Sequence, residues 1–523
     1  MLNKLCNLSK SLLFFVVGIV PYLIMQIVAL KSLTAPEFKL LNWSTIALFI
    51  LLFIDIYFLY YYRNRKLSIK LELLLLFKVC LFGLIVRIFI IYAFQTYPIS
   101  DFSSVYNVSS GIVDSGLREY VNMFIHLFYH SKLLSFVFSI FGASIFIAQM
   151  VNCFFSIITM IFIYKISKII FSSQTLAIIP VLLFNCDLSL ASYTGVLAPE
   201  HISMAFLTIA LYFIALVYKE RLDVDETYKI TIFYLLSGVF LVFSSMFKPI
   251  GIVIIIAIVL VELLRHIPSI SLKDNNIKSY VYNILKKAIP VFALLLVYFL
   301  GNFLSVKYQK DSYTKLGYDT FNEKPLFSIV YHGLAFEGKG QWNPNVVNYI
   351  NSVAREHNYN KKEINRELKE QLFNDFKIHA REYIPFIRNK LEISWDPGSA
   401  YIYWAYRDQS APPINMPLSQ YETTVTIRNI SRCYYIMLSA FGLISSFFLC
   451  FKPKKIDDIT FLLNMITFGS ALLFILIEAQ GRYKSAIYPV MIIVISYGAI
   501  ITMKFIDKIN ICLFNKLSNK KNT

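Results

Sequence analysis

Charged residues are scarce in this chain of 523 residues. Asp, Glu, Lys and Arg together make up 16% of it, whereas an ordinary soluble domain contains about 25%. Hydrophobic residues make up 57%, and the mean hydropathy is +0.59. A soluble core cannot bury that much apolar surface, so the composition predicts a polytopic membrane protein.

Closely spaced cysteine pairs are also missing. The 7 Cys are scattered and none forms a CxxC pair, so neither a zinc site nor a disulfide framework is indicated. No internal repeat is visible, and no basic domain or finger stands apart from the apolar runs. The excess of 50 Lys and Arg over 32 Asp and Glu therefore fits the cytoplasmic loops of a membrane protein better than nucleic-acid binding.

Apolar runs predict an all-α polytopic membrane protein with about twelve transmembrane helices of about 17–25 residues each. The first run lacks a small-residue cleavage site, so it is expected to be an uncleaved span and not a signal peptide. The expected spans are 11–31, 44–62, 71–95, 142–164, 173–192, 197–218, 230–247, 249–265, 289–306, 431–450, 459–478 and 485–503.

Basic residues sort the connecting loops into two sets. They gather in alternate loops, such as Arg63 to Lys70, and in the tail from Lys504 to Lys521. The positive-inside rule then predicts a multi-pass cell-membrane protein with both termini in the cytoplasm. The features expected on the outer face are Asp101, Glu200, Lys248, the long loop 307–430 and Arg482.

Two outer regions are longer than simple connectors. The first, 96–141, mixes apolar and polar residues in a way that suits helices lying in the membrane interface. The second, 307–430, is expected to be a small, mostly helical extracytoplasmic domain, with one or two helices in Val346 to Asn389. The aromatic run 401–406 could stack on sugar rings or pack within that domain. The predicted division is a transmembrane region at 1–306, the outer domain at 307–430, and a C-terminal transmembrane region with a basic tail at 431–523.

Asp101 lies where the third span meets water. A carboxylate there can take a proton from an acceptor hydroxyl, or it can serve only as a helix cap. Glycosyl transfer on the outer face uses sugars carried on a polyprenyl phosphate, because nucleotide sugars stay in the cytoplasm. Such an enzyme needs cations near the interface for the phosphate leaving group. Lys248 and Arg482 can supply them, although basic side chains at span ends also snorkel to lipid headgroups.

Two further carboxylates lie at outer span ends. Glu200 opens a span, where the helix dipole stabilises a negative charge whether or not the residue serves a site. Glu478 ends an apolar span, where ionisable groups are costly and usually functional or paired. The spacing predicts Arg482, four residues on, as its partner.

Together these motifs resemble the GT-C superfamily of polyprenyl-phosphate-sugar-dependent glycosyltransferases, close to the bacterial relatives of protein mannosyltransferase and of the lipid A aminoarabinose transferase. The segments that carry the resemblance are Pro98-Ile99-Ser100-Asp101-Phe102 with Tyr106, Leu197-Ala198-Pro199-Glu200, Phe247-Lys248-Pro249, and Ile477 to Tyr483 with Pro489. The resemblance implies that Asp101 is the catalytic base. The resemblance and the chemistry of the span ends together predict a set of residues that contact substrate. These are Glu200, Lys248, Arg482, Tyr483, Tyr106 and Glu478.

The first loop departs from the family pattern. Many relatives carry a second acid next to the catalytic Asp or two residues after it, and Phe102 and Ser103 occupy those places here. Asp114 and Glu119 lie further along and could substitute. No metal ligand is therefore assigned and no cofactor is certain, while a divalent metal stays an open alternative.

The predicted function is inverting transfer of a sugar from a polyprenyl-phosphate donor to a cell-envelope glycan or a lipid-linked acceptor. The expected partners are these two substrates and the lipid bilayer, with no nucleic acid. The alternative is a polysaccharide polymerase or an enzyme resembling the O-antigen ligases. A less favoured alternative is a transporter or flippase of lipid-linked glycans, which would place charges near the bilayer centre.

Overall fold

A computed structural model describes residues 2–34, 43–94, 96–112, 114–219, 227–266, 277–317, 325, 327–397, 420–451 and 457–521. Regular structure in these ranges is helical throughout, which confirms the all-α prediction. The aromatic run 401–406 lies outside the described residues.

The helices of the first half are α1 (Leu2–Ser32), α2 (Trp43–Tyr61), α3 (Ile69–Phe94), α4 (Asp101–Ser109), α5 (Ser115–Met123), α6 (Ile125–Phe141), α7 (Ile145–Phe171), α8 (Ile178–Asn185), α9 (Leu188–Tyr193), α10 (Glu200–Lys219), α11 (Thr227–Phe247) and α12 (Gly251–His266). Those of the second half are α13 (Ile277–Lys315), α14 (Phe327–Leu334), η3 (Phe336–Gly338), α15 (Pro344–Glu356), α16 (Lys361–Ile378), α17 (Tyr383–Ser394), α19 (Gln420–Cys450), α20 (Asp458–Leu476), η5 (Gly481–Ile487) and α21 (Tyr488–Lys521).

Nine of the described helices are long and apolar enough to cross a membrane, or ten if the bent pair α5 and α6 counts as one span. The chain is thus a multi-pass membrane protein, but the expected count of twelve is not confirmed. In their described parts, α2 and α12 are shorter apolar helices. The expected span 173–192 is two short helices, α8 and α9, because Asp187 caps a new helix there by accepting from the backbone N–H groups of Ser189 and Leu190.

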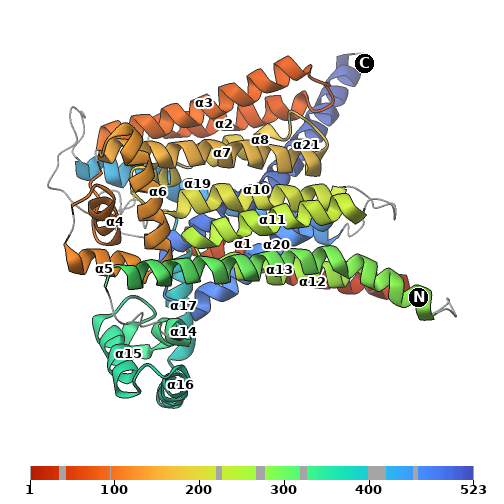
Figure 1. Cartoon of the computed structure of the whole chain (residues 1–523). Coiled ribbons are helices and arrows are strands. Elements are labelled where there is room, and N and C mark those ends of the chain that lie inside the picture. The colour runs from red at the N-terminus through yellow and green to blue at the C-terminus, as the bar shows by residue number, and fades with distance from the viewer. Residues whose placement is uncertain are drawn as a thin grey trace.

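The spans run side by side and define two ends of the bundle (Figure 1). The start of α1 and the end of α21 lie at one end, and α4 and α5 lie at the other. We call the α4 end the site end. α6 runs across the direction of the spans (Figure 1) and meets α5 at a bend of 115°. That the site end faces away from the cytoplasm stays a prediction from the charge pattern.

Small residues allow the spans to approach closely, as is common in membrane bundles. A Cβ at Gly498 of α21 would lie 1.8 Å from the carbonyl oxygen of Phe441 on α19. A Cβ at Gly301 of α13 would lie 2.6 Å from Val242 on α11. Both contacts join helices far apart in sequence, so these glycines help to fix which spans are neighbours.

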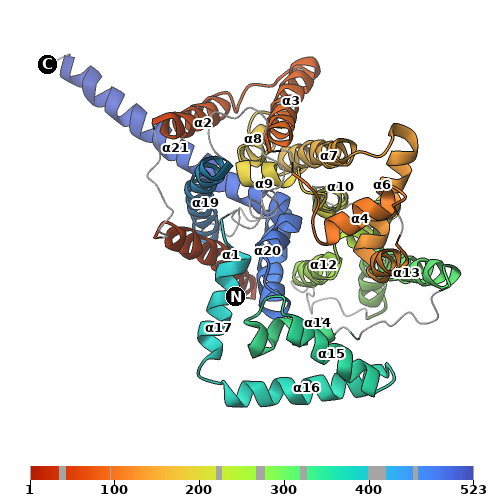
Figure 2. The ribbon, with the colours of Figure 1, turned by 90° about the vertical axis from the view of Figure 1, so that its left-hand side faces the viewer.

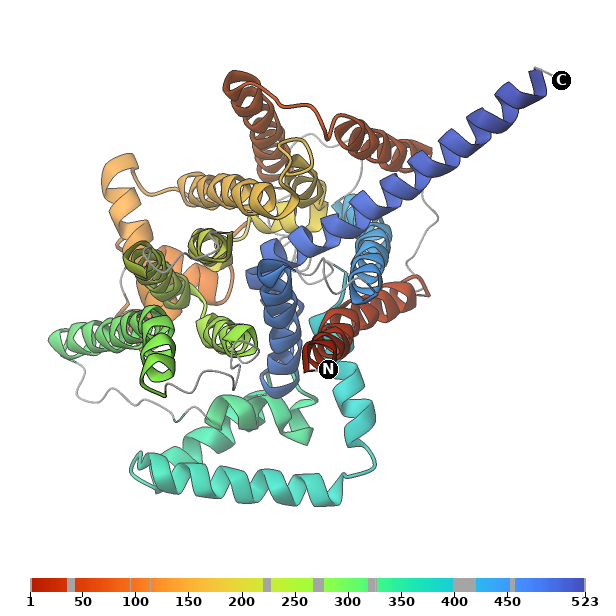
Figure 3. The ribbon, with the colours of Figure 1, turned by 90° about the vertical axis from the view of Figure 1, so that its right-hand side faces the viewer.

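α14 to α17 form a helical unit. α14, α15 and α16 share an apolar cluster that buries Tyr331, Val346, Ile350, Val353 and Leu368, among others, and α17 joins them through ring contacts of Tyr383 and Phe386 with Phe336. In the two views along the spans, α15 and α16 lie beside the bundle (Figures 2 and 3). The stretch Val346 to Asn389, expected to hold one or two helices, contributes to three, namely α15, α16 and α17. α13 continues to Lys315, past the predicted domain boundary at 307, so the division into domains stays a prediction.

The helical unit is attached to the bundle at the site end. Lys390 of α17 is fully buried, and its Nζ donates to the carbonyl of Gly333 and, at 2.7 Å, to the carbonyl of Ile477. Ala479 N donates to the Gly340 carbonyl at 2.6 Å. The unit therefore holds the backbone on both sides of Glu478, which lies between α20 and η5.

Candidate active site

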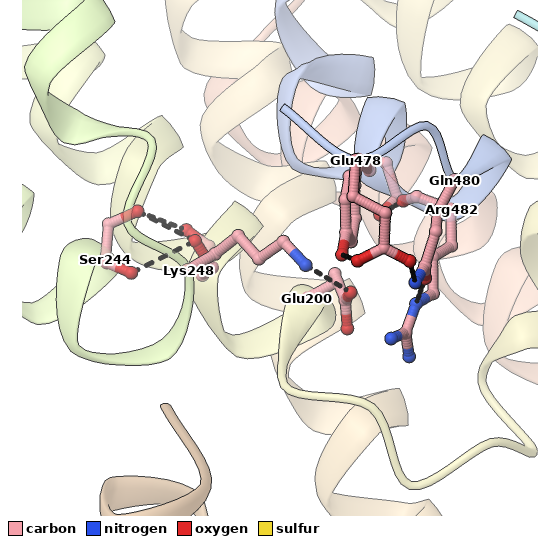
Figure 4. Close-up of polar contacts among 9 residues, drawn as sticks. Glu200, Ser244, Lys248, Glu478, Gln480 and Arg482 are labelled. Carbon is pink, nitrogen blue, oxygen red and sulfur yellow. Dashed lines mark hydrogen bonds and ion pairs between the residues drawn. The ribbon is translucent and has the colours of Figure 1, made fainter. Parts of the chain in front are cut away.

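Glu200 and Lys248 form an ion pair at the site end, with Lys248 Nζ 3.0 Å from Glu200 Oε1 (Figure 4). The Lys248 N–H still donates to the carbonyl of Ser244, one helical turn back, and Pro249 follows. Lys248 thus stands where the helical bonding of α11 stops. The hydroxyls of Ser203 on α10 and Ser244 on α11 form a hydrogen bond of 2.9 Å. This bond holds together the two helices whose ends carry Glu200 and Lys248.

The Glu200 carboxylate is only partly satisfied by this pair. The residue is 1% exposed, and among the described residues no group donates to its Oε2. Burial lowers the pKa of Lys248, and the neighbouring carboxylate opposes that shift. A buried carboxylate oxygen without a donor is costly, so Glu200 keeps one acceptor position that a further donor could occupy.

The loop from Glu478 to Tyr483 brings a second cation to the same place. Arg482 Nε donates to Gln480 Oε1 at 2.5 Å, and Gln480 Nε2 donates to Glu478 Oε1 at 2.5 Å. Gln480 therefore links the carboxylate to the guanidinium. The helical spacing from which we predicted that pair does not apply, because α20 ends at Leu476.

Arg482 and Tyr483 connect this loop to two other segments. Lys248 Nζ lies 4.0 Å from the centre of the Tyr483 ring, and the Arg482 guanidinium carbon lies 5.1 Å from the centre of the Phe102 ring. Both distances fit cation–π contacts. In Figure 4 the Lys248, Glu200 and Arg482 side chains point toward one another from three separate segments.

Asp101 is the first residue of α4, next to Phe102. Its Oδ1 accepts a hydrogen bond from the Tyr120 hydroxyl of α5 at 2.6 Å. Burial and the adjacent Asp101 charge raise the pKa of Tyr120, so the phenol keeps its proton at neutral pH and acts as the donor. Asp101 is therefore held by a side chain 19 residues away, which makes it more than a solvated loop residue.

The backbone before Asp101 is unusual. Ser100 has a φ of 54°, a left-handed conformation that costs a non-glycine residue about 1–3 kcal/mol. Its carbonyl accepts from the Ser103 hydroxyl at 2.7 Å and from the Ser103 N–H at 3.1 Å. Strain of this kind gathers at functional sites, and here it directly precedes the carboxylate.

Tyr106, which we expected in the site, packs edge to face on Phe138 of α6 with ring centres 5.8 Å apart.

His126 of α6 was not predicted to be a site residue. Desolvation and then the charge of Lys248 lower its pKa to about 4, with Asp101 and Glu200 opposing. His126 is thus a neutral imidazole near the ionic groups. The sequence gave no signal for this, because His126 and His130 both fit the polar positions of an amphipathic helix.

The described residues offer no group of three or more His, Cys, Asp or Glu side chains that could hold a metal ion. Glu119, considered as a second acid, accepts from the Tyr313 hydroxyl of α13 at 2.8 Å. Asp114 precedes α5 as its N-cap residue. Neither residue is joined to Asp101 by these contacts.

Residues 128–300 match the family model for dolichyl-phosphate-mannose-protein mannosyltransferase. This match confirms the resemblance to the GT-C superfamily. The matched stretch contains Glu200 and Lys248, while Asp101 and Arg482 lie outside it. A search of curated proteins found no match.

Among solved structures, the chain is similar to the archaeal oligosaccharyltransferase AglB from Archaeoglobus fulgidus, solved in complex with an inhibitory peptide and a dolichol-phosphate. The two share 11% identity at a TM-score of 0.42, over 86% of this chain and 52% of AglB. The chain therefore spans about half the length of that protein.

Proposed function

We propose that this protein is a GT-C-type glycosyltransferase that moves a sugar from a polyprenyl-phosphate donor to a cell-envelope glycan or a lipid-linked acceptor. The site end would face away from the cytoplasm, and the helical unit α14 to α17 would belong to an extracytoplasmic domain. The observation that carries the proposal is the meeting of four segments: the start of α4, the start of α10, the turn after α11, and η5. Glu200 pairs with Lys248, Lys248 lies over Tyr483, and Arg482 lies over Phe102, the residue after the hydrogen-bonded Asp101.

In the proposed reaction, Asp101 takes the proton of the acceptor hydroxyl. The acceptor oxygen forms a bond to the anomeric carbon as the bond from that carbon to the phosphate oxygen breaks, which inverts the configuration. The polyprenyl phosphate leaves with the electron pair and gains negative charge at the departing oxygen. Lys248 and Arg482 stabilise that charge, and their partial burial strengthens the effect.

Glu200 has a separate part in this proposal. It keeps Lys248 charged and in place, and its second oxygen accepts a hydrogen bond from the sugar or the acceptor. Gln480 and Glu478 hold Arg482 through the hydrogen bonds described above. Tyr483 covers the Lys248 ammonium. These are positioning roles, which act on the reaction through the two cations.

The test is transfer from a radiolabelled polyprenyl-phosphate sugar in proteoliposomes that contain the full chain. Addition of one sugar per acceptor, with free polyprenyl phosphate as the second product, supports the proposal. Products lengthened by many repeats would support the polymerase alternative and overturn the proposal. Absence of any transfer with a panel of hexose, pentose and aminopentose donors would also overturn it.

One observation favours the transporter alternative. Arg87 is fully buried inside α3, where its Nη1 donates to the Gly83 carbonyl and to Asn185 Oδ1 at 3.0 and 3.2 Å. A charge at that depth is unusual and often marks a transport path. Flux of a fluorescent polyprenyl-linked sugar across the same vesicles, without glycosylation, would support this alternative. An Arg87→Met protein that transfers sugar normally would instead make Arg87 structural.

A further inference from the structure

α16 and α17 leave an apolar groove open on the surface of the helical unit. The groove has a volume of about 780 Å³ and is lined by Leu372, Phe373, Phe376, Tyr383, Ile384 and Ile387, among others. Three of the lining side chains are at least half exposed: Phe373 at 59%, Phe376 at 50% and Ile384 at 80%. A water-facing surface rarely presents such a contiguous apolar patch without a partner.

The orientation of these helices indicates what covers the groove. α16 appears end-on in Figure 1, where the spans lie across the view, and it lies across the view in Figure 2, where the spans appear end-on. α16 therefore runs at a right angle to the spans, parallel to the plane that a bilayer around them would take. It lies beside the bundle in both views along the spans (Figures 2 and 3), where a bilayer around the spans would lie.

Contacts of α17 fix the depth of the groove. Lys31, in the last turn of the α1 span, pairs with Glu392 of α17 at 2.5 Å. Lys390, also on α17, donates to the carbonyl of Ile477, the residue after α20. Both contacts join α17 to the point where a span ends, which is the level of the lipid headgroups. α17 lies across the view in Figure 2, where the spans appear end-on, so the groove at its other end lies at a similar depth.

Charge beside the groove agrees with this depth. Lys369 lines the groove, with Nζ 5.5 Å from the centre of the Phe327 ring, and Lys377 Nζ lies 4.5 Å from the centre of the Phe373 ring. Lysines that lie along apolar surface and hold their ammonium at its edge are typical of helices in the membrane interface. The groove thus has an apolar floor with lysines at its edge, and α16 also carries Glu370 and Asp375. The lysine stems along the apolar surface, and not a net positive charge, match the membrane interface.

We propose that the α16–α17 groove is seated in the outer-leaflet interface of the bilayer and takes up lipid acyl chains. This docking holds the helical unit at a fixed depth beside the candidate active site, because Lys390 of α17 donates to the carbonyl of Ile477 and Gly340, which follows η3, accepts from the N–H of Ala479. The proposal depends on the placement of the spans in a membrane and not on the sugar chemistry. It is therefore tested without an activity assay.

The experiment attaches an environment-sensitive fluorophore to single cysteines in full-length variants that lack other reactive cysteines. The test sites are Phe373→Cys and Ile384→Cys. The matched controls are Asn374→Cys on α16 and Asn389→Cys on α17, which are exposed and do not line the groove. Each protein is reconstituted into phosphatidylcholine and phosphatidylglycerol vesicles, with and without bromine near the headgroup end of the acyl chains.

Blue-shifted emission and loss of most fluorescence in brominated vesicles at both test sites, with unshifted emission at both controls, is the expected result. Water-like emission without bromine quenching at the test sites would overturn the proposal. A shift that appears only after polyprenyl phosphate is added would overturn it too, since the groove would then hold the carrier and not the bilayer. A shift that appears only at high protein density would overturn it in favour of a second copy of the chain.

Discussion

The Lys248 ammonium lies 4.0 Å from the centre of the Tyr483 ring, although the two residues come from spans far apart in the sequence. This contact joins the turn after α11 to η5. It brings the Glu200–Lys248 pair to the loop that carries Arg482. The proposed phosphate site depends on this junction, because each cation alone could serve only as an anchor at a span end.

The charge of Lys248 is expected to control donor binding. Loss of one charge-assisted hydrogen bond to phosphate removes about 1.5–3 kcal/mol, which corresponds to roughly a ten- to hundredfold rise in donor KM for Lys248→Met. Lys248→Arg keeps the charge and should recover part of the loss. A Lys248→Met protein with the wild-type donor KM would show that the ammonium serves another purpose.

The pH profile supplies an independent check on the same residue. The pKa of Lys248 is lowered by burial, so its charge is present below that value and is lost as pH rises through it, earlier than for an ordinary lysine. Donor binding should therefore weaken on the alkaline side, and Lys248→Arg should move that limb to higher pH because arginine stays protonated. Identical alkaline limbs in wild type and Lys248→Arg would contradict this assignment.

Tyr120 is expected to position the carboxylate of Asp101. Tyr120→Phe removes the hydrogen bond of 2.6 Å and should lower kcat about tenfold, with little change in donor KM, because a bond to a charged group is worth about 1.5–3 kcal/mol. Tyr129→Phe, which removes a hydroxyl bonded to the Ser305 carbonyl, is the matched control on α6. Equal rates for the two variants would exclude the positioning role.

Gly333 sets how closely the helical unit approaches the loop with Glu478. A Cβ at Gly333 would lie 2.3 Å from the carbonyl carbon of Ile477, so backbone must move in Gly333→Ala. We expect a loss of about 1–3 kcal/mol in stability, as for other overpacked sites, seen as a lower Tm in detergent. Gly116→Ala is the control, since its Cβ would meet only Asp114 at 3.7 Å. A Gly333→Ala protein as stable as this control would show that the backbone at Ile477 can move aside at little cost in stability.

The sequence predicted the all-α architecture and the position of several candidate site residues near span ends, since both follow from local patterns of apolar and charged residues. Glu200 and Lys248 illustrate this, because the local pattern around each residue predicts on its own that the residue lies at an outer span end. Their contact was not predicted, because it depends on how α10 and α11 pack. Asp187 shows the opposite limit, where a single capping carboxylate divides a run that is apolar enough to read as one span.

Contacts between distant segments account for what the sequence did not reveal. Tyr120 and His126 lie in a stretch whose pattern indicates only an amphipathic helix, and their nearness to Asp101 and Lys248 depends on how α4, α5 and α6 pack on one another. Gln480 was overlooked because the spacing from Glu478 to Arg482 suggested a helix that has already ended at Leu476. Contacts of this kind between distant segments can be identified only once the fold is known.

The most direct measurement compares Asp101→Asn with wild type for transfer of labelled sugar from a polyprenyl-phosphate donor in proteoliposomes, with donor binding measured in parallel. The proposed mechanism predicts loss of nearly all transfer, since the base is gone, while the variant folds and still binds the donor through Lys248 and Arg482. Undiminished transfer by Asp101→Asn would contradict the mechanism.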